Sequence, residues 1–151
     1  MPELLMFAGC EKLLVDEMGN PSLISLLQTI TVDIPANIAV PPNILSPNQW
    51  DVVTLWRALT DDEVGAEYTQ IVEVVMPEGG AMPLRSQVTF ALPPRNAVHR
   101  NKVHVIGIPV SVAGEVRVTL RIHRPGEPVP EQPYAVWPLF IVHNRVEAVG
   151  Q

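Results

Sequence analysis

Hydrophobic and polar residues alternate with a period of two along most of this chain, a pattern typical of β-strands with one buried face. The cleanest run covers residues 115–123. Its apolar positions are Val116, Val118, Leu120 and Ile122, and its polar positions are Arg117, Thr119, Arg121 and His123. The alternation predicts a strand whose aliphatic side chains enter the core and whose charged side chains face solvent.

Segment 10–32 predicts a β-hairpin. Residues up to Val15 form its first strand, followed by a turn over 16–21 in which Gly19 and Asn20 tolerate the positive φ of a hairpin connection. We expect the return strand to span residues 22–32. Its inward face is predicted to carry Ile24, Leu26, Ile30 and Val32. Leu23 and Leu27 break the alternation on the opposite face.

Further strands are expected at 50–59, 68–76, 87–92, 102–110, 115–123 and 134–146. Segment 50–59 is apolar on both faces, which indicates a central strand covered on both sides or by a partner subunit. Residues 111–114 predict a second hairpin between the two strands that flank them. The connection 34–49 contains four prolines, which cannot donate to a sheet ladder, so we expect it to lie over an open end of the core.

These elements together predict an all-β protein with no α-helix. The chain of 151 residues is expected to form a single domain over 1–151, long enough to bury ~70% of its unfolded surface around one core. About eight short strands with turns at this spacing indicate an antiparallel β-sandwich of the immunoglobulin-like or jelly-roll-like kind.

The composition adds an expectation of self-association. Charged residues make up 17% of the chain, below the usual ~25%, and the mean hydropathy is positive. The sixteen prolines occur in short clusters, so they separate strands rather than indicate disorder. Such a chain exposes more apolar surface than a lone soluble domain needs.

The net charge of −6 argues against a binder of duplex nucleic acid, whose affinity depends on neutralising phosphates. Residues 1–80 hold 12 acidic and two basic residues, whereas residues 81–151 hold four acidic and eight basic ones. Acidic and basic strands can be neighbours within one molecule, or an acidic patch can meet a basic patch of another copy. We favour the first interpretation, because surface charges pair locally more often than they direct assembly.

The single cysteine excludes an internal disulfide. No apolar run approaches the ~20 residues of a membrane helix, so we expect no membrane partner and a cytoplasmic protein. Cys10 follows Phe7-Ala8-Gly9, which looks like a lipoprotein cleavage site, but the preceding apolar run is too short and acidic Glu3 replaces a basic segment. Cys10 is therefore interpreted as a small core residue.

The opening of the chain also resembles a bacterial family that is known only as a domain of unknown function. The residues that carry the resemblance are Cys10, Glu11, Val15, Asp16, Gly19, Ser22, Leu23 and Ile24. It implies a small all-β protein with an immunoglobulin-like sandwich. The family brings no known activity, cofactor or catalytic residue.

Motifs for nucleophilic catalysis, phosphate binding and zinc binding are absent, and no pattern indicates a cofactor. The acidic residues Asp16, Asp61, Asp62 and Glu63 could converge at one end of a sandwich and hold Ca²⁺ through oxygen ligands. The alternative is a pair of solvated turns, where aspartate is favoured for backbone reasons.

A second group of candidates would contact a partner. If residues 111–114 form a hairpin, His104 lies near Arg121, and a basic strip with Arg117 and His123 could hold an anionic ligand or an acidic segment, or be a solvated face. Trp50 and Trp56 are interpreted as core or interface anchors. Pro41 and Pro42 belong to the apolar, proline-rich end.

We therefore expect a non-enzymatic interaction or structural module that self-associates or binds another protein, possible roles being an adaptor or a subunit of a bacterial or phage assembly. The alternative is a protein that binds a small ligand or a metal ion through the acidic end or the histidines. A binder of single-stranded nucleic acid is disfavoured by the charge.

Overall fold

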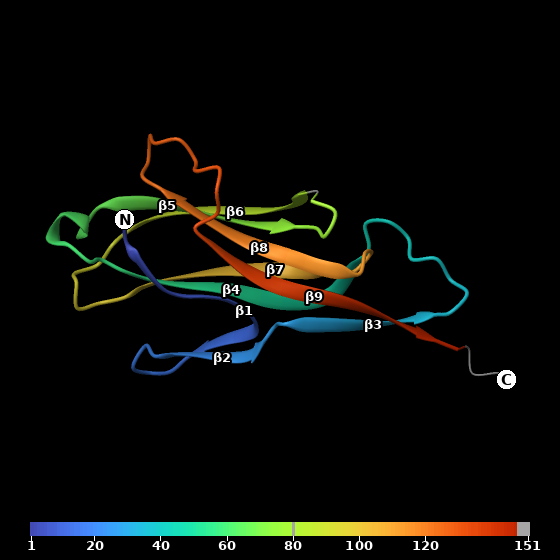
Figure 1. The fold of residues 1–151 in the computed structure, drawn as a ribbon. Helices are drawn as coiled ribbons and strands as arrows, with labels where there is room; N and C mark the ends of the chain where they lie inside the picture. Colours follow the sequence, from blue (N-terminus) through green and yellow to red (C-terminus); the bar gives the residue numbers. More distant parts are fainter. Residues whose placement is uncertain (80, 148–151) are drawn as a thin grey trace.

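The computed structural model describes residues 1–79 and 81–147, which form an all-β structure of nine strands in two sheets (Figure 1). The strands are β1 (Glu3–Val15), β2 (Pro21–Leu26), β3 (Thr29–Pro35), β4 (Leu45–Arg57), β5 (Glu67–Val75), β6 (Ala81–Ala91), β7 (His99–Pro109), β8 (Gly114–His123) and β9 (Ala135–Val146). The four-stranded sheet has the order β2-β1-β4-β7, and the five-stranded sheet the order β3-β9-β8-β5-β6. In this part of the chain, one 3-10 turn at Asp61–Glu63 is the sole helical element, and no helix is long and apolar enough to cross a membrane.

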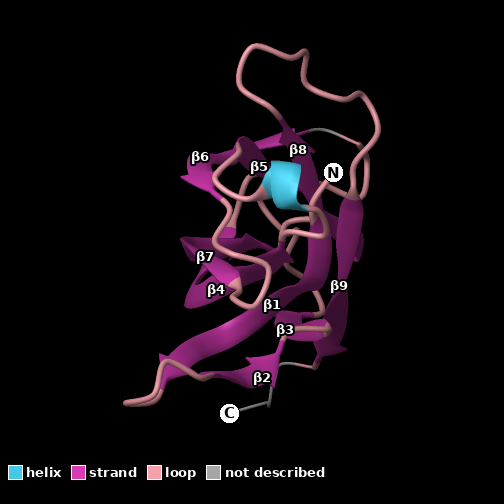
Figure 2. Cartoon of the chain, turned by 90° about the vertical axis from the view of Figure 1, so that its left-hand side faces the viewer, coloured by secondary structure: helices cyan, strands magenta, loops and turns pink. Residues whose placement is uncertain are grey.

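The core lies between the two sheets, which Figure 2 shows as two layers viewed nearly along the strands. The alternation predicted for β8 is confirmed, because all four of its aliphatic side chains are buried: Val116, Val118, Leu120 and Ile122. They pack with Trp50, Val52 and Trp56 of β4. Strand β4 pairs with β1 on one side and β7 on the other, so the predicted central strand is also confirmed.

The return strand predicted for residues 22–32 is wrong as a single element. It divides into β2 and β3, which belong to different sheets. The N–H of Leu27 donates to the carbonyl of Gly9 in the four-stranded sheet, and the carbonyl of Gln28 accepts from Phe140 in the five-stranded sheet. We call Leu27–Gln28 the crossing segment. The inward face predicted for this strand is therefore wrong in β2, where Ile24 and Leu26 are exposed and Leu23 is half-buried.

Two predicted pairings are also wrong. Strand β3 pairs with β9 in parallel, so the sheets are not wholly antiparallel. Residues 111–114 do not close a hairpin, because β7 pairs with β4 in one sheet and β8 with β5 and β9 in the other. Alternation identifies a strand and its buried face, but a short connection can equally pass between sheets.

The β1–β2 hairpin bends across the outer face of the four-stranded sheet. Pairing of β1 with β4 ends at Cys10 and Asp51, yet the N–H of Leu13, three residues further on, still donates to Asp51 Oδ2 at 3.0 Å. At the tip, the carbonyl of Gly19 accepts from Arg100 of β7. Asp51 is therefore buried although it alternates with core-facing residues.

A buried polar network joins the sheets through one acceptor atom. Gln70 Oε1 on β5 accepts hydrogen bonds from Thr54 Oγ1 at 2.7 Å, Trp56 Nε1 at 2.9 Å and Asn101 Nδ2 at 3.2 Å. The three donor residues belong to the facing sheet, Thr54 and Trp56 to β4 and Asn101 to β7. A buried donor without an acceptor is costly, so this oxygen constrains how the sheets are aligned.

We predict that Gln70→Leu lowers the free energy of unfolding by about 3 kcal/mol or more, because it leaves three buried donors without an acceptor. Chemical denaturation followed by tryptophan fluorescence measures the change. Gln87→Leu is the matched control, because Gln87 is exposed on the neighbouring strand β6. An equal effect of the two substitutions would contradict the assigned role of Gln70.

Candidate interaction surface

An apolar row runs along β9 on the outer face of the five-stranded sheet. Leu139 and Ile141 point into the core and are buried. The residues that alternate with them point outward: Val136, Pro138, Phe140 and Val142. Val136 is 42% exposed, and Phe140 and Val142 are each 44% exposed. We call these four residues the β9 row, and it is the main apolar feature of this sheet face.

Polar residues border the β9 row on both sides. On β3, Thr29 pairs with Phe140 and Thr31 with Val142. On β8, Glu115 pairs with Phe140 and Arg117 with Pro138. Both charged side chains are exposed, and within residues 1–79 and 81–147 neither forms an ion pair. The apolar row is thus flanked by one unpaired acid and one unpaired base.

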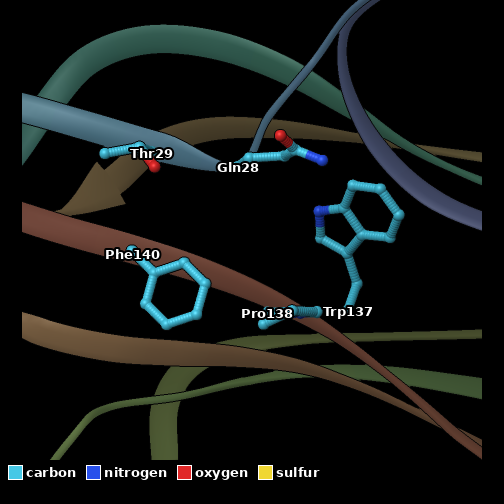
Figure 3. A pocket seen from close by; sticks show the side chains of 5 residues that line it. All are labelled: Gln28, Thr29, Trp137, Pro138 and Phe140. Atoms are coloured by element: carbon cyan, nitrogen blue, oxygen red, sulfur yellow. The ribbon is translucent and has the colours of Figure 1, made fainter.

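A shallow hollow of about 360 Å³ adjoins the row where β3 has not yet begun. Figure 3 shows Gln28 and Thr29 on one side of it and Trp137, Pro138 and Phe140 on the other. The indole N–H of Trp137 donates to the carbonyl of Leu27 at 2.8 Å, which holds the wall of the hollow to the crossing segment. The volume of the hollow lies at the lower end of the range for small-molecule pockets, and it is also large enough for one aromatic side chain.

The basic residues predicted on β8 do share this outer face, but two of them are already engaged. Arg121 pairs with Glu73 of β5, which also contacts Arg85. His123 Nδ1 hydrogen-bonds the carbonyl of Arg124, and its Nε2 is buried without a partner in the described chain. Of these three basic residues, only Arg117 is both exposed and without an ion pair among the described residues.

The predicted proximity of His104 and Arg121 is wrong, because these residues lie on different sheets. The acidic first half of the chain and the basic second half do pair within one molecule. Glu73 forms ion pairs with Arg85 and Arg121, and Asp61 forms one with Arg95.

Trp50 and Trp56 belong to the core, and the interface interpretation of these residues is corrected. They are 1% and 0% exposed, and their indole N–H groups are satisfied by Gly107 and Gln70. Pro41 and Pro42 lie exposed in the loop between β3 and β4, at one end of the sheets.

The four predicted calcium ligands do not converge. Asp16 accepts hydrogen bonds from the backbone of Met18 and Asn20 within its own turn, and these bonds lower its pKa. Asp61 and Asp62 are exposed in the 3-10 turn. Over the described ranges, no group of three or more His, Cys, Asp or Glu side chains is arranged to hold a metal ion.

Glu63, the fourth predicted ligand, turns inward. Its carboxylate contacts the amino group of Met1 at 2.8 Å and accepts from the N–H of Leu59. Burial raises the pKa of Glu63, but these bonds outweigh burial and lower it.

The β1–β2 hairpin presents a second apolar surface. Its exposed residues are Leu14, Val15, Met18, Ile24 and Leu26. The same hairpin carries Glu11, Asp16 and Glu17 against the single base Lys12, so its charge is acidic. We call it the hairpin surface.

Cys10, Asp51 and His104 form a row across β1, β4 and β7. His104 Nδ1 lies 2.8 Å from Asp51 Oδ1. Burial raises the pKa of the Cys10 thiol and the charge of Asp51 raises it further, so the sulfur stays protonated and inaccessible. The carboxylate separates thiol from imidazole, which is not the order needed to activate a nucleophile.

Neither protein-family models nor curated protein sequences match the chain. The resemblance carried by Cys10 and its neighbours stays an interpretation of the sequence.

We predict that the buried carboxylate of Asp51 makes stability depend on pH. Burial raises its pKa, but the hydrogen bonds from His104 and Leu13 together outweigh burial, and its pKa is lowered. A lowered pKa stabilises the folded state above the ordinary pKa of aspartate, ~3.9, and this stabilisation is lost as the pH falls through the folded value.

The wild type should therefore exceed Asp51→Asn in stability by about 1–3 kcal/mol at pH 7, and the gap should narrow below about pH 4. Denaturation at several pH values measures it, with Asp62→Asn as the control at an exposed aspartate. If the difference in stability between the wild type and Asp51→Asn widened at low pH, the lowered pKa of Asp51 would be contradicted.

Proposed function

We propose that this protein is a non-enzymatic interaction module that self-associates through the outer face of its five-stranded sheet. The observation that carries the proposal is the β9 row, a continuous line of exposed apolar side chains on a sheet whose other face forms the core. Burying such a side chain contributes about 1.5–3 kcal/mol. A subunit of a larger cytoplasmic assembly is the role that suits this surface best.

The surroundings of the candidate nucleophile and its nearest histidine support a non-enzymatic role. Cys10 is fully buried, and His104 is engaged by Asp51. The hollow beside the β9 row is lined by one amide, one hydroxyl and three apolar side chains, without an ionisable group. Such a lining suits a side chain of a partner better than a reaction.

The order of the strands supports an immunoglobulin-like sandwich. If β1 corresponds to strand A of a variable-type domain, and β4, β5, β6, β7, β8 and β9 to strands B, C, C′, E, F and G, the two sheets read β2-A-B-E and β3-G-F-C-C′. The disulfide of antibody domains has no counterpart, since Cys10 on β1 is the single cysteine. A jelly-roll is the less supported alternative.

A Ca²⁺ or small-ligand protein is the competing function. It has less support, because Asp16 and Glu63 are each satisfied by groups of their own surroundings. This function predicts a rise in melting temperature with bound ion, which self-association does not.

We predict that light scattering of the purified protein gives a discrete oligomer whose mass is the same in EDTA and in Ca²⁺. Phe140→Lys should weaken its association at least about 30-fold, equivalent to about 2 kcal/mol of lost apolar burial. Ile106→Lys is the control, because Ile106 is 68% exposed but lies on β7 in the other sheet. A monomer at all concentrations would refute the proposed function.

A further inference from the structure

We propose that the occupant of the β9 row is a second copy of this chain, related by a two-fold axis that crosses the strands at the level of Leu139. The inference rests on the proposed function and specifies its partner and register. It follows from the arrangement of the side chains around that level, on both β9 and β8.

The β9 row is symmetric about Leu139. When two copies of one sheet face pack together around an axis perpendicular to the strands, a residue n positions before the axis meets the residue n positions after it. Pro138 then faces Phe140 of the second copy, and Val136 faces Val142. Every outward position of the row meets an apolar position, as a self-complementary interface requires.

The flanking charges have the same symmetry. Val116 pairs with Leu139, so the axis passes between Glu115 and Arg117 on β8. Glu115 of each copy therefore faces Arg117 of the other, which gives two ion pairs for one interface. Like charges would have faced each other if both positions carried the same sign, at a cost in affinity. These are also the two charged residues beside the row that lack an ion pair within the described chain.

The hollow beside the row fits the same register. It opens at the level of Pro138, which the two-fold axis places opposite Phe140 of the second copy. The aromatic ring would enter a space bordered by Trp137 and Thr29. Aromatic side chains that fill pockets of a partner contribute a large share of binding energy.

The hairpin surface is a weaker candidate for the same partner. It carries three acids and one base, so two copies of it would repel each other. It stays in the test as the rival surface.

Charge reversal tests the register. Glu115→Arg makes both positions basic, and Arg117→Glu makes both acidic. Each single variant should dissociate at least tenfold more readily than the wild type at low salt, where exposed charges are least screened. The double variant should associate like the wild type. A mixture of the two single variants should form mixed dimers in preference to either homodimer, as native mass spectrometry would show.

Glu11→Arg is the control, because it reverses an exposed charge on the hairpin surface. If the wild type associates but reversals at positions 115 and 117 do not change its affinity, the two-fold register is overturned while the proposed function stands. The same holds if Glu11→Arg alone disrupts association. If the wild type is monomeric, the proposed function fails as well. Rescue by the double variant and mixed dimers together support the inference.

Discussion

The architecture depends on how the chain passes from one sheet to the other at Leu27 and Gln28. Three hydrogen bonds hold this segment. One joins it to Gly9 in the four-stranded sheet, and two join it to Phe140 and to the indole of Trp137 in the five-stranded sheet. Glycine is favoured at position 9, because a Cβ would lie 3.2 Å from both Trp50 and Trp137, closer than ordinary van der Waals contact. The segment places β3 beside β9, and it leaves the start of β9 uncovered. The hollow beside the β9 row is a direct consequence.

Much of the fold could be predicted from the sequence because burial leaves a local pattern. The alternation in β8 identified its buried face correctly, and the two-faced apolar character of β4 identified a central strand. Which strands pair with each other could not be predicted in the same way, since the pairing of β7 with β4 depends on residues more than forty positions apart. The broken alternation at Leu23 and Leu27 was the local sign that β2 and β3 separate, and one long strand was the wrong interpretation of it.

The candidate surface was harder to predict than the fold. The sequence marked Arg117 as an outward residue, but it could not show that Arg121 is already paired with Glu73. It left core and interface positions open for Trp50 and Trp56, and both are core residues. The row on β9 was open to prediction, since Val136, Phe140 and Val142 alternate with Leu139 and Ile141. Which face of β9 is buried depends on where the other sheet packs. That alignment involves the hydrogen bonds of Gln70, whose role has no local signal in the sequence.

Photo-crosslinking from position 140 would show directly which surface meets the β9 row. A benzoylphenylalanine in place of Phe140 keeps an aromatic ring in the β9 row, and mixing isotopically light and heavy chains distinguishes crosslinks between copies from those within one. If the two-fold contact forms, crosslinks between copies should map to the β9 row around Pro138. Crosslinks to the hairpin surface, or none between copies, would contradict it.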